Sequence, residues 1–490
     1  MQKSFQNFII VFLAFNMHGI AQELSQTLEI KDGFYIYNDK AHQKNSSLTL
    51  LQKNKSSKKK QIIFSNINSE LEINNFNSNN KLGAGYFQKD SQFADYFYSP
   101  SGENFVFFDG KDYININGEK KISDIDLNGD IEENPKYNNI KQKWVDVISK
   151  EFLTDTHIIS LGRKTGSEHR KNGDFKAIEI YIYKKELNSL QETYNKLELP
   201  EGYWFAGRNP KLFYYNSKYF MLKYTVEGNK ELNSYHVLKF DYKGKLLSNI
   251  KLSSKPTNDK ENFALVNYGA DAFTEWNRIS SGGHVESTFY RANINSFGAI
   301  KYSEIDNSFY LISGLQIENE DDGFIVTKYD NTGKLDWIRK HLITDSNLVM
   351  SNSYNRHLYL DISKDYAGVS YYTKKGKRQC KFFLLNKDDG ELIVKEEFKN
   401  YDFYKLNGLN DYNYNGLYSR FILKDSFTKK IRLNRQTILG TIFSEDFRKF
   451  VTNSSENGKD QMIVSYFTSK GVALIKAEKK NPKMSVYSFQ

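Results

Sequence analysis

A strand, a glycine-containing turn and a second strand recur along the chain, and this repeat limits the fold more than any other feature. Residues 327–340, TKYDNTGKLDWIRK, have β-forming residues up to Tyr329, a polar turn that ends at Gly333, and a second strand-like run. Further hairpins of this layout are predicted at 236–252, 380–398 and 462–480, and looser versions at 113–127 and 178–194. The chain is therefore expected to be built from one repeated unit.

A serine-led turn comes before several of these hairpins. Ser99, Ser363 and Ser444 each begin a turn that is followed by a run of apolar and aromatic residues. Turn and hairpin together predict four antiparallel strands in about 40 residues, which is the size of a propeller blade. Such units are predicted at 93–127, 357–398 and 440–478, with partial copies at 33–66, 155–197, 215–252 and 309–341.

These units predict an all-β protein, a single β-propeller with seven four-stranded antiparallel blades. Extra strand-like segments at 285–304 and 405–435 leave six to eight blades open. No linker rich in Pro, Gly or Ser divides the chain, which favours one ring over a pair of sandwich domains, and no long helix is predicted. We expect the strand near residues 33–38 to pair with the last blade and close the ring.

The serine-led turn resembles the SPDG element of TolB-like β-propeller repeats. Ser101 stands in place of the Asp in the first copy. In the other two copies Lys364 and Glu445 replace the Pro, and Tyr366 and Phe447 replace the Gly. The resemblance implies the fold and brings no catalytic residue with it.

The N-terminus has the layout of a cleaved export signal. Lys3 is followed by the apolar run 8–15 and by the small residues Gly19 and Ala21 before Gln22. The run is too short for a transmembrane segment, which takes about 20 apolar residues. The signal resembles those of exported Bacteroidota proteins. Residues 1–21 are therefore predicted to be a signal peptide and 22–490 a monomeric domain in the periplasm or outside the cell, the alternative being a buried first strand.

Cysteine content and charge exclude some classes of protein. Cys380 is the single cysteine, so the chain cannot form an internal disulfide, and it lies in an apolar run that predicts a buried thiol. The net charge of +10 is spread along the chain except for a basic cluster at 52–61. That cluster could contact an anionic polymer, but its short length between strand patterns favours a solvated turn. An export signal also argues against nucleic acid as a partner.

The segment DIDLNGDIEEN (124–134) matches the first eight positions of a D-x-D-x-N-G calcium loop. Glu132 could complete the site, similar to the ninth-position Asp in the calcium loops of integrin-like propellers. Calcium needs several oxygen ligands from one tight loop, and alternate carboxylates around a glycine turn supply them. Pro135 stands where a bidentate Glu would complete an EF-hand loop, so a surface strand with an Asn-Gly turn is the alternative. The candidate metal ligands are Asp124, Asp126, Asn128, Asp130 and Glu132, and no other cofactor is predicted.

Residues 268–287, YGADAFTEWNRISSGGHVES, carry the richest mixture of reactive side chains. They are predicted to form a long loop between strands, and long loops are where ligand contacts usually arise. The alternative is a solvated loop whose tryptophan packs on the ring. The candidate ligand-binding residues are Asp271, Glu275, Trp276, Arg278, His284 and Glu286.

Two classes of function fit these features. The modular blades and the absence of catalytic motifs favour a non-catalytic propeller that binds a protein or glycan at the cell envelope. The alternative is a carbohydrate-active hydrolase or lyase with carboxylates such as Asp271 and Glu275 on one face of the propeller. That chemistry would need two carboxyl groups about 5–10 Å apart, one of them with a raised pKa.

Overall fold

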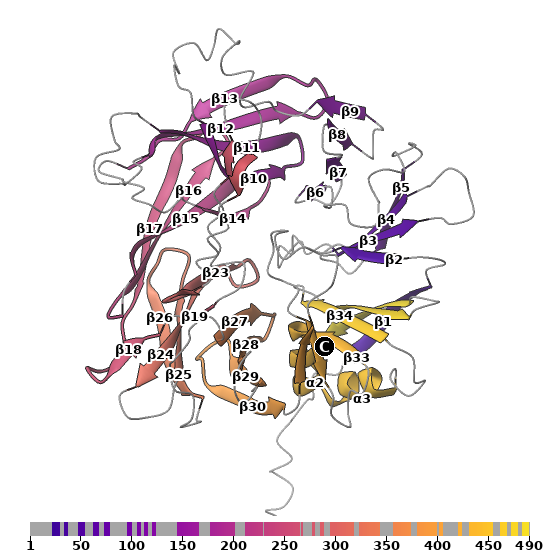
Figure 1. Ribbon diagram of the computed structural model, residues 1–490, viewed down its shortest axis with the longest axis vertical. Helices are drawn as coiled ribbons and strands as arrows, with labels where there is room; N and C mark the ends of the chain where they lie inside the picture. Colours follow the sequence, from indigo (N-terminus) through magenta and orange to yellow (C-terminus); the bar gives the residue numbers. More distant parts are fainter. Residues whose placement is uncertain are drawn as a thin grey trace, which may run out of the picture.

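The repeated hairpins form antiparallel sheets that stand in a ring in the computed structural model (Figure 1). The described strands make seven sheets of four to seven strands and one two-stranded ribbon. This arrangement is a β-propeller and confirms the predicted all-β class. The structure describes residues 96–99, 145–165, 177–200, 211–228, 230–264, 266–267, 295–317, 323–343, 356–373, 380–398 and 431–453, and elsewhere the strands named below.

Four sheets are simple four-stranded meanders. The first two are β2 (Phe34–Tyr37), β3 (Leu48–Lys53), β4 (Ile62–Ile67) and β5 (Ile73–Ser78), then β6 (Tyr96–Tyr98), β7 (Phe105–Phe108), β8 (Asp112–Asn115) and β9 (Lys120–Ser123). The next two are β10 (Val145–Leu153), β11 (His157–Thr165), β12 (Ala177–Glu186) and β13 (Glu192–Lys196), then β14 (Lys211–Tyr215), β15 (Tyr219–Gly228), β16 (Asn233–Asp241) and β17 (Leu246–Ser254).

Two sheets carry extra strands. One contains β24 (Ser308–Ile317), β25 (Gly323–Tyr329) and β26 (Leu335–Leu342), and two separate strands, β18 (Glu261–Phe263) and β23 (Ala299–Ser303), both pair with β24. The other contains β27 (Arg356–Ile362), β28 (Tyr366–Thr373), β29 (Cys380–Asn386) and β30 (Leu392–Phe398), extended next to β27 by β19 (Val266–Asn267) and β22 (Asn295–Ser296). The two-stranded ribbon is β20 (Asn277–Ile279) with β21 (Val285–Thr288).

The last sheet joins the two ends of the chain. Its order is β1-β36-β35-β34-β33-β32-β31, and β1 pairs antiparallel with β36. The expected closing strand near 33–38 was wrong, because β2 (Phe34–Tyr37) belongs to its own meander and the closing strand is the segment before it. The strands are β1 (Gln22–Glu29), β31 (Tyr401–Tyr404), β32 (Arg420–Leu423), β33 (Ile431–Asn434), β34 (Gln461–Phe467), β35 (Val472–Glu478) and β36 (Lys483–Phe489).

The prediction of a serine-led turn between two strands at 441–453 was wrong. This segment belongs to two helices, α2 (Arg435–Phe443) and α3 (Glu445–Asn453). Ser444 lies between them, and its hydroxyl accepts a hydrogen bond from the backbone N–H of Phe447 at 3.2 Å. Serine at the N-cap followed by two acidic residues in the first turn stabilises a helix start. The helices connect β33 to β34, which run parallel and therefore need a crossover.

The predicted turn at Ser363 joins β27 to β28, and Ser99 directly follows β6, the strand that pairs with β7. The Ser363 hydroxyl accepts a hydrogen bond from the backbone N–H of Tyr366 at 3.2 Å. Thr154 and Asn216 hold the same position in two other sheets, where their side-chain oxygens accept bonds of 3.0 Å from the backbone N–H three residues later. One turn geometry therefore recurs with three different side chains.

Apolar clusters hold neighbouring sheets together. One cluster joins the β10–β13 and β14–β17 sheets, where the rings of Phe152 and Tyr215 lie 4.6 Å apart. Another joins the sheets that contain β24 and β28, where Phe324 meets Phe383 edge to face at 5.0 Å. Burial against neighbours on both sides explains how a chain of this length can fold without one central core.

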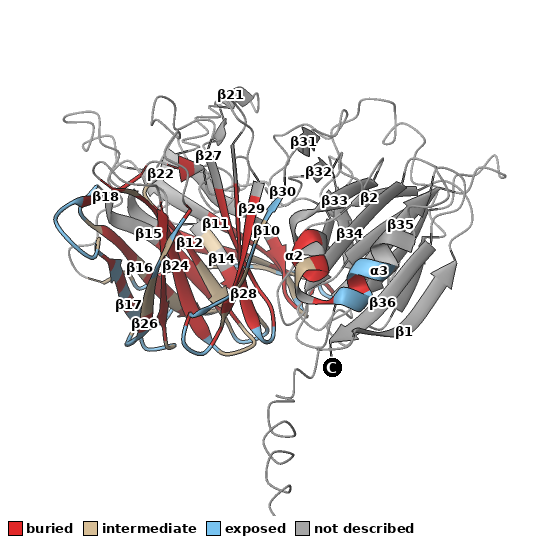
Figure 2. Cartoon of the chain, turned by 90° about the horizontal axis from the view of Figure 1, so that it is seen from below, coloured by how far each residue is buried: buried red, intermediate tan, exposed pale blue. Residues whose placement is uncertain are grey.

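The two faces of the ring differ (Figure 2). In each described meander the turns between first and second and between third and fourth strands lie at the same end, and we call this end the short-turn face. Its turns include 154–156, 216–218, 242–245, 330–334, 363–365 and 387–391. The opposite end carries the β20–β21 ribbon, and we call it the long-connection face after the long segment of chain between β19 and β22.

Gly333 shows why the repeated hairpin needs glycine. Its φ of 89° lies in the left-handed region, and an added Cβ would stand 2.6 Å from Cγ2 of Ile250 in the preceding sheet. Gly244 and Gly390 have the same backbone conformation and are equally tight against the sheet before them. At the corresponding place in the looser hairpin 178–194, Leu190 adopts a φ of 60°.

Substituting Gly333 with alanine should therefore lower the free energy of unfolding by about 2–3 kcal/mol, from the left-handed backbone and the overpacking together. Thr332→Ala is the matched control in the same turn, because its hydroxyl bonds to Asp330 at an exposed position and should cost less than about 1 kcal/mol. Urea denaturation compares the two variants. An equal loss of unfolding free energy in Gly333→Ala and Thr332→Ala would contradict the need for glycine where this turn lies against the preceding sheet.

Candidate functional site

The predicted ligand-binding segment belongs to a connection on the central side of the ring. β19 and β22 pair with each other, and β19 continues the β27–β30 sheet next to β27. β27 is the strand of that sheet nearest the middle of the ring in Figure 1, and β30 is on the outside. Residues 268–294, which we call the excursion, therefore leave and return at the central side of the ring and not at its outer rim.

The ribbon within the excursion reaches the far side of the ring. β20 lies beside β10, whose sheet stands opposite the β27–β30 sheet in Figure 1. Figure 2 places β21 at the outermost level of the long-connection face. The β20–β21 ribbon therefore lies on this face beside β10, across the ring from β19 and β27.

The structure describes part of the predicted ligand-binding set. Arg278 lies in β20 opposite Ser287, and Glu286 lies in β21, both described by their backbone. Asp271, Glu275, Trp276 and His284 lie outside the described residues. The structure places β20 and β21 side by side, and the convergence of the six side chains stays a prediction.

The candidate calcium ligands Asp124, Asp126, Asn128, Asp130 and Glu132 follow the end of β9 and also lie outside the described residues. Calcium binding by this segment therefore remains a prediction. In the part of the chain that the structure describes, no three His, Cys, Asp or Glu side chains are grouped for a metal ion.

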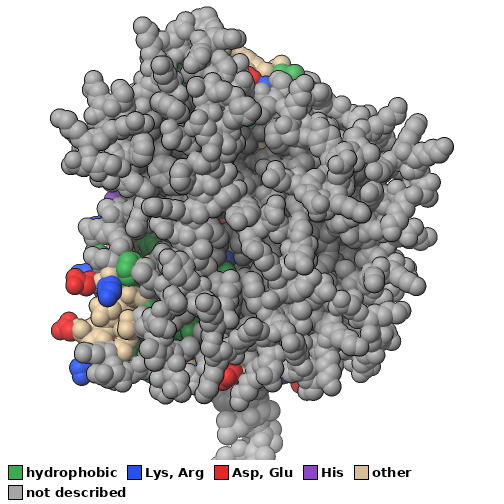
Figure 3. Space-filling model, viewed as in Figure 1, with side chains coloured by type: hydrophobic (Ala, Val, Ile, Leu, Met, Phe, Trp, Pro, Cys, Tyr) green, Lys and Arg blue, Asp and Glu red, His purple; other side chains and the backbone are tan. Residues whose placement is uncertain are grey.

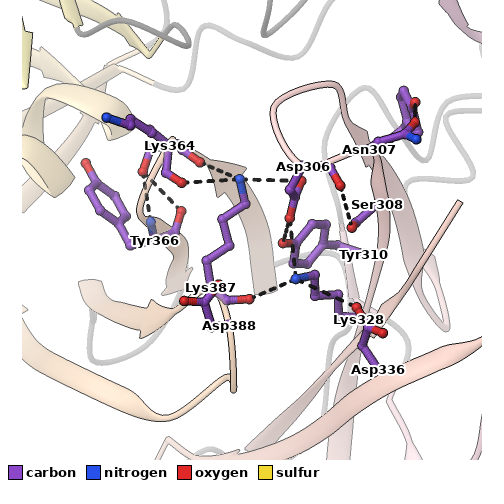
Figure 4. Close-up of polar contacts among 12 residues, drawn as sticks. Asp306, Asn307, Ser308, Tyr310, Lys328, Asp336, Lys364, Tyr366, Lys387 and Asp388 are labelled. Atoms are coloured by element: carbon purple, nitrogen blue, oxygen red, sulfur yellow. Dashed lines mark hydrogen bonds and ion pairs between the residues drawn. The ribbon is translucent and has the colours of Figure 1, made fainter.

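A cluster of charged side chains lies between two sheets at the short-turn face (Figure 4). Asp306, in the turn between β23 and β24, accepts a 2.6 Å hydrogen bond from the hydroxyl of Tyr310. Its two oxygens lie 3.4 Å from Nζ of Lys387 and 3.5 Å from Nζ of Lys328. We call these four residues the Asp306 cluster. It joins the β24 sheet, which supplies three of them, to the β29–β30 turn.

Each ammonium group of the Asp306 cluster faces several oxygens. Lys387 also donates to the carbonyls of Ser363 at 3.0 Å and Lys364 at 3.4 Å. Lys328 also donates to the carbonyl of Lys387 at 3.3 Å and lies 3.8 Å from the carboxylate of Asp336. With three oxygens around each ammonium, the donors of both lysines are occupied within the protein.

The electrostatics of the Asp306 cluster do not suit acid catalysis. Burial alone would raise the pKa of Asp306, but the hydroxyls of Ser303 and Tyr310 and the ammonium groups of Lys387 and Lys328 more than offset it, so this pKa is lowered. Burial lowers the pKa of Lys387, against the opposing effect of Asp306. A general acid needs a raised carboxyl pKa at neutral pH, so the cluster is better explained as a tie between sheets.

The sequence contains a signal for such ties that the hairpin pattern alone does not reveal. A lysine stands two residues before the acidic residue of the turn in Lys184–Glu186, Lys239–Asp241 and Lys328–Asp330. Lys184 and Lys328 each donate across to the next sheet, to the carbonyl of Tyr242 at 2.8 Å and of Lys387 at 3.3 Å. Both acceptors directly follow the first residue of the corresponding turn, so the contact occurs at two of the sheet interfaces. Lys239 instead lies over the ring of Tyr219, 3.7 Å from its centroid.

Described side chains give no single-sign charged patch in the view of Figure 3. Acidic and basic groups are interspersed at one edge, over β18 and β26. Of the two described helices, neither is long and apolar enough to cross a bilayer.

No protein-family model and no curated protein sequence matches the chain. Solved structures with a similar course of the chain include a subtype N11 neuraminidase-like protein of A/flat-faced bat/Peru/033/2010, at a TM-score of 0.26 and 10% identity over 76% of this chain and 92% of that one. An acylaminoacyl peptidase of Pyrococcus horikoshii has a TM-score of 0.26 and 11% identity, over 76% of this chain and 53% of the peptidase. Likenesses this weak carry no functional argument, and the fold assignment depends on the sheet order of the chain itself.

Proposed function

We propose that this chain is an exported, non-catalytic propeller that binds a protein or glycan partner through its long-connection face. The observation that carries the proposal is the position of the β20–β21 ribbon: β20 lies beside β10, although β19, the strand before the excursion, pairs with β27. Rigid scaffolds commonly present ligand contacts on such connections. The contact residues in this proposal are Asp271, Glu275, Trp276, Arg278, His284 and Glu286.

The opposite face supports the proposal by contrast. Its turns are short, and the polar side chains that begin them, such as Thr154, Asn216 and Asp330, bond to their own turn backbones. The Asp306 cluster likewise has its donors occupied. A face whose polar groups already have partners offers a ligand less than one that carries a separate ribbon such as β20–β21.

The test is a glycan array probed with the protein from Gln22 onward, together with a photo-crosslinking amino acid at position 276 in cells of the native host. The variant W276A/R278A should lose at least about tenfold in affinity for the bound glycan, the scale of losing one aromatic or arginine anchor. The matched control Lys243→Ala, in an exposed turn of the short-turn face, should bind like the unaltered protein.

Several outcomes would contradict the proposal. Binding that survives W276A/R278A but is lost in Lys243→Ala would assign the short-turn face instead. Release of reducing sugar from the bound glycan, abolished by Asp271→Ala with Glu275→Ala, would establish the hydrolase or lyase alternative. An intact Met1 terminus on the protein from its native host would refute export through residues 1–21.

A further inference from the structure

After the excursion the chain passes through β22 into β23, an edge strand whose outward carbonyls need donors. β23 pairs with β24 along one side, and residues 297 and 298 lead directly into it. Backbone carbonyls that are buried without a donor cost free energy, so a partner is expected for each. The partners come from the preceding sheet, β14–β17.

Three buried side chains of that sheet bond to consecutive points of the returning segment. Asn233 donates from Nδ2 to the carbonyl of Phe297 at 2.7 Å and to the hydroxyl of Ser313 at 3.0 Å. The hydroxyl of Tyr235 donates to the carbonyl of Gly298 at 2.5 Å. Nζ of Lys223 donates to the carbonyl of Ile300 at 3.2 Å. The exposed fractions of Asn233, Tyr235 and Lys223 are 1%, 6% and 7%.

The backbone at this point also has no room to move sideways. A Cβ on Gly298 would stand 2.8 Å from the Ser313 hydroxyl, 3.0 Å from the carbonyl of Ile312 and 3.1 Å from Nδ2 of Asn233. The returning segment is therefore enclosed between β24 on one side and the donors of the β14–β17 sheet on the other.

The start of the connection is held by the same neighbour. The backbone N–H of Phe263 donates to the carbonyl of Lys230 at 2.7 Å, just before β16, and that of Ala264 donates to Gly314 at 2.8 Å. The strand before the long connection, β18, and the strand after it, β23, thus both contact the β14–β17 sheet, whereas β20 within the connection contacts β10.

Burying polar donors at this interface has an energetic disadvantage over apolar packing. An ammonium group loses hydration on burial, and apolar residues of similar volume often stabilise an interface as well or better. What directional hydrogen bonds add is a defined position of the segment that accepts them.

We propose that Lys223, Asn233 and Tyr235 are positioning residues that fix where the chain enters β23 after the excursion, and thereby how β20 and β21 lie beside β10. The consequence for ligand binding rests on the function proposed above. The positioning itself does not, because it can be measured without a ligand.

Trypsin cleavage within the excursion tests the proposal on the protein from Gln22 onward, since Arg278 and Arg291 lie in its sequence. Tyr235→Phe removes one hydroxyl and keeps the ring. Losing a hydrogen bond worth about 1 kcal/mol should speed native-state cleavage at these arginines about fivefold. Lys223→Met, which keeps the apolar stem and removes the donors, should act in the same direction.

Tyr329→Phe is the matched control. Its hydroxyl also donates to a backbone carbonyl between these two sheets, that of Ser253, but away from the excursion. Tyr329→Phe should leave cleavage at Arg278 and Arg291 unchanged. It should lower the midpoint of urea unfolding by about as much as Tyr235→Phe does. Equal acceleration in both tyrosine variants, or none in Tyr235→Phe, would overturn the proposal.

The same variants separate this inference from the proposed function. Faster cleavage in Tyr235→Phe with no bound glycan or protein partner would retain the positioning role and reject the binding function. Unchanged cleavage with weakened glycan binding would retain the binding function and reject the positioning role.

Discussion

Removing residues 22–29 should abolish cooperative folding of the ring. β1 pairs with β36 at seven positions, and it is the strand through which the two ends of the chain meet. At about 1 kcal/mol for each backbone hydrogen bond, the deletion should cost about 5 kcal/mol or more, which is comparable to the whole stability of many proteins. Thermal and urea unfolding followed by circular dichroism would measure the loss.

A pair of single substitutions makes this test sharper. β1 is an edge strand, so adjacent residues direct their N–H groups alternately toward β36 and away from it. Of Thr27→Pro and Leu28→Pro, one removes a ladder hydrogen bond and the other does not, so their unfolding midpoints should differ clearly. Two equally mild variants would show that β1 is dispensable for closure.

Replacing Asp306 with alanine should be the most damaging single change at the short-turn face. It leaves the ammonium groups of Lys328 and Lys387 beside each other, with exposed side-chain fractions of 10% and 5%, without their shared carboxylate. Breaking a buried ion pair costs about 3–5 kcal/mol, and we expect about 3 because Asp306 is itself 24% exposed and Lys328 keeps Asp336 nearby.

Lowering the pH should reduce the contribution of Asp306 to the free energy of unfolding. The pKa of Asp306 is lowered in the folded protein, so the folded state favours the ionised form. Its stabilising effect is fully present above the unfolded pKa of about 4 and is lost as the pH falls through the lower folded value. The gap in unfolding free energy between the unaltered protein and Asp306→Asn should therefore narrow from pH 7 to pH 3. If the difference in unfolding free energy is the same at pH 7 and pH 3, the contribution of Asp306 comes from packing and not from its charge.

Local chemistry explains which elements could be predicted from the sequence. The hairpin at 327–340 depends on a turn whose residues act on their own backbone, so its strands β25 and β26 were confirmed. The helices α2 and α3 had a readable signal in Ser444 followed by Glu445 and Asp446, but the similar turns at Ser99 and Ser363 favoured a strand.

Contacts between distant segments could not be predicted in this way. The Asp306 cluster brings together side chains from positions 306 and 387, and β20 lies against β10, more than a hundred residues earlier in the chain. The closing strand has just two apolar residues, Leu24 and Leu28, which is too few for a clear strand pattern. Its place is determined by β36, and only the complete ring shows it.

The closing strand is the earliest part of the ring to be synthesised and the last to be incorporated. While the other strands pair with near neighbours, β1 must wait for β36, which is separated from it by nearly the whole chain. Such a distant pairing is slow to form, and an unpaired strand can meanwhile recruit other chains. The sequence QELSQTLE carries Glu23, Glu29 and several uncharged polar residues, a composition with little tendency to aggregate. The polarity of β1 therefore suits a strand that spends the assembly of the protein exposed to water.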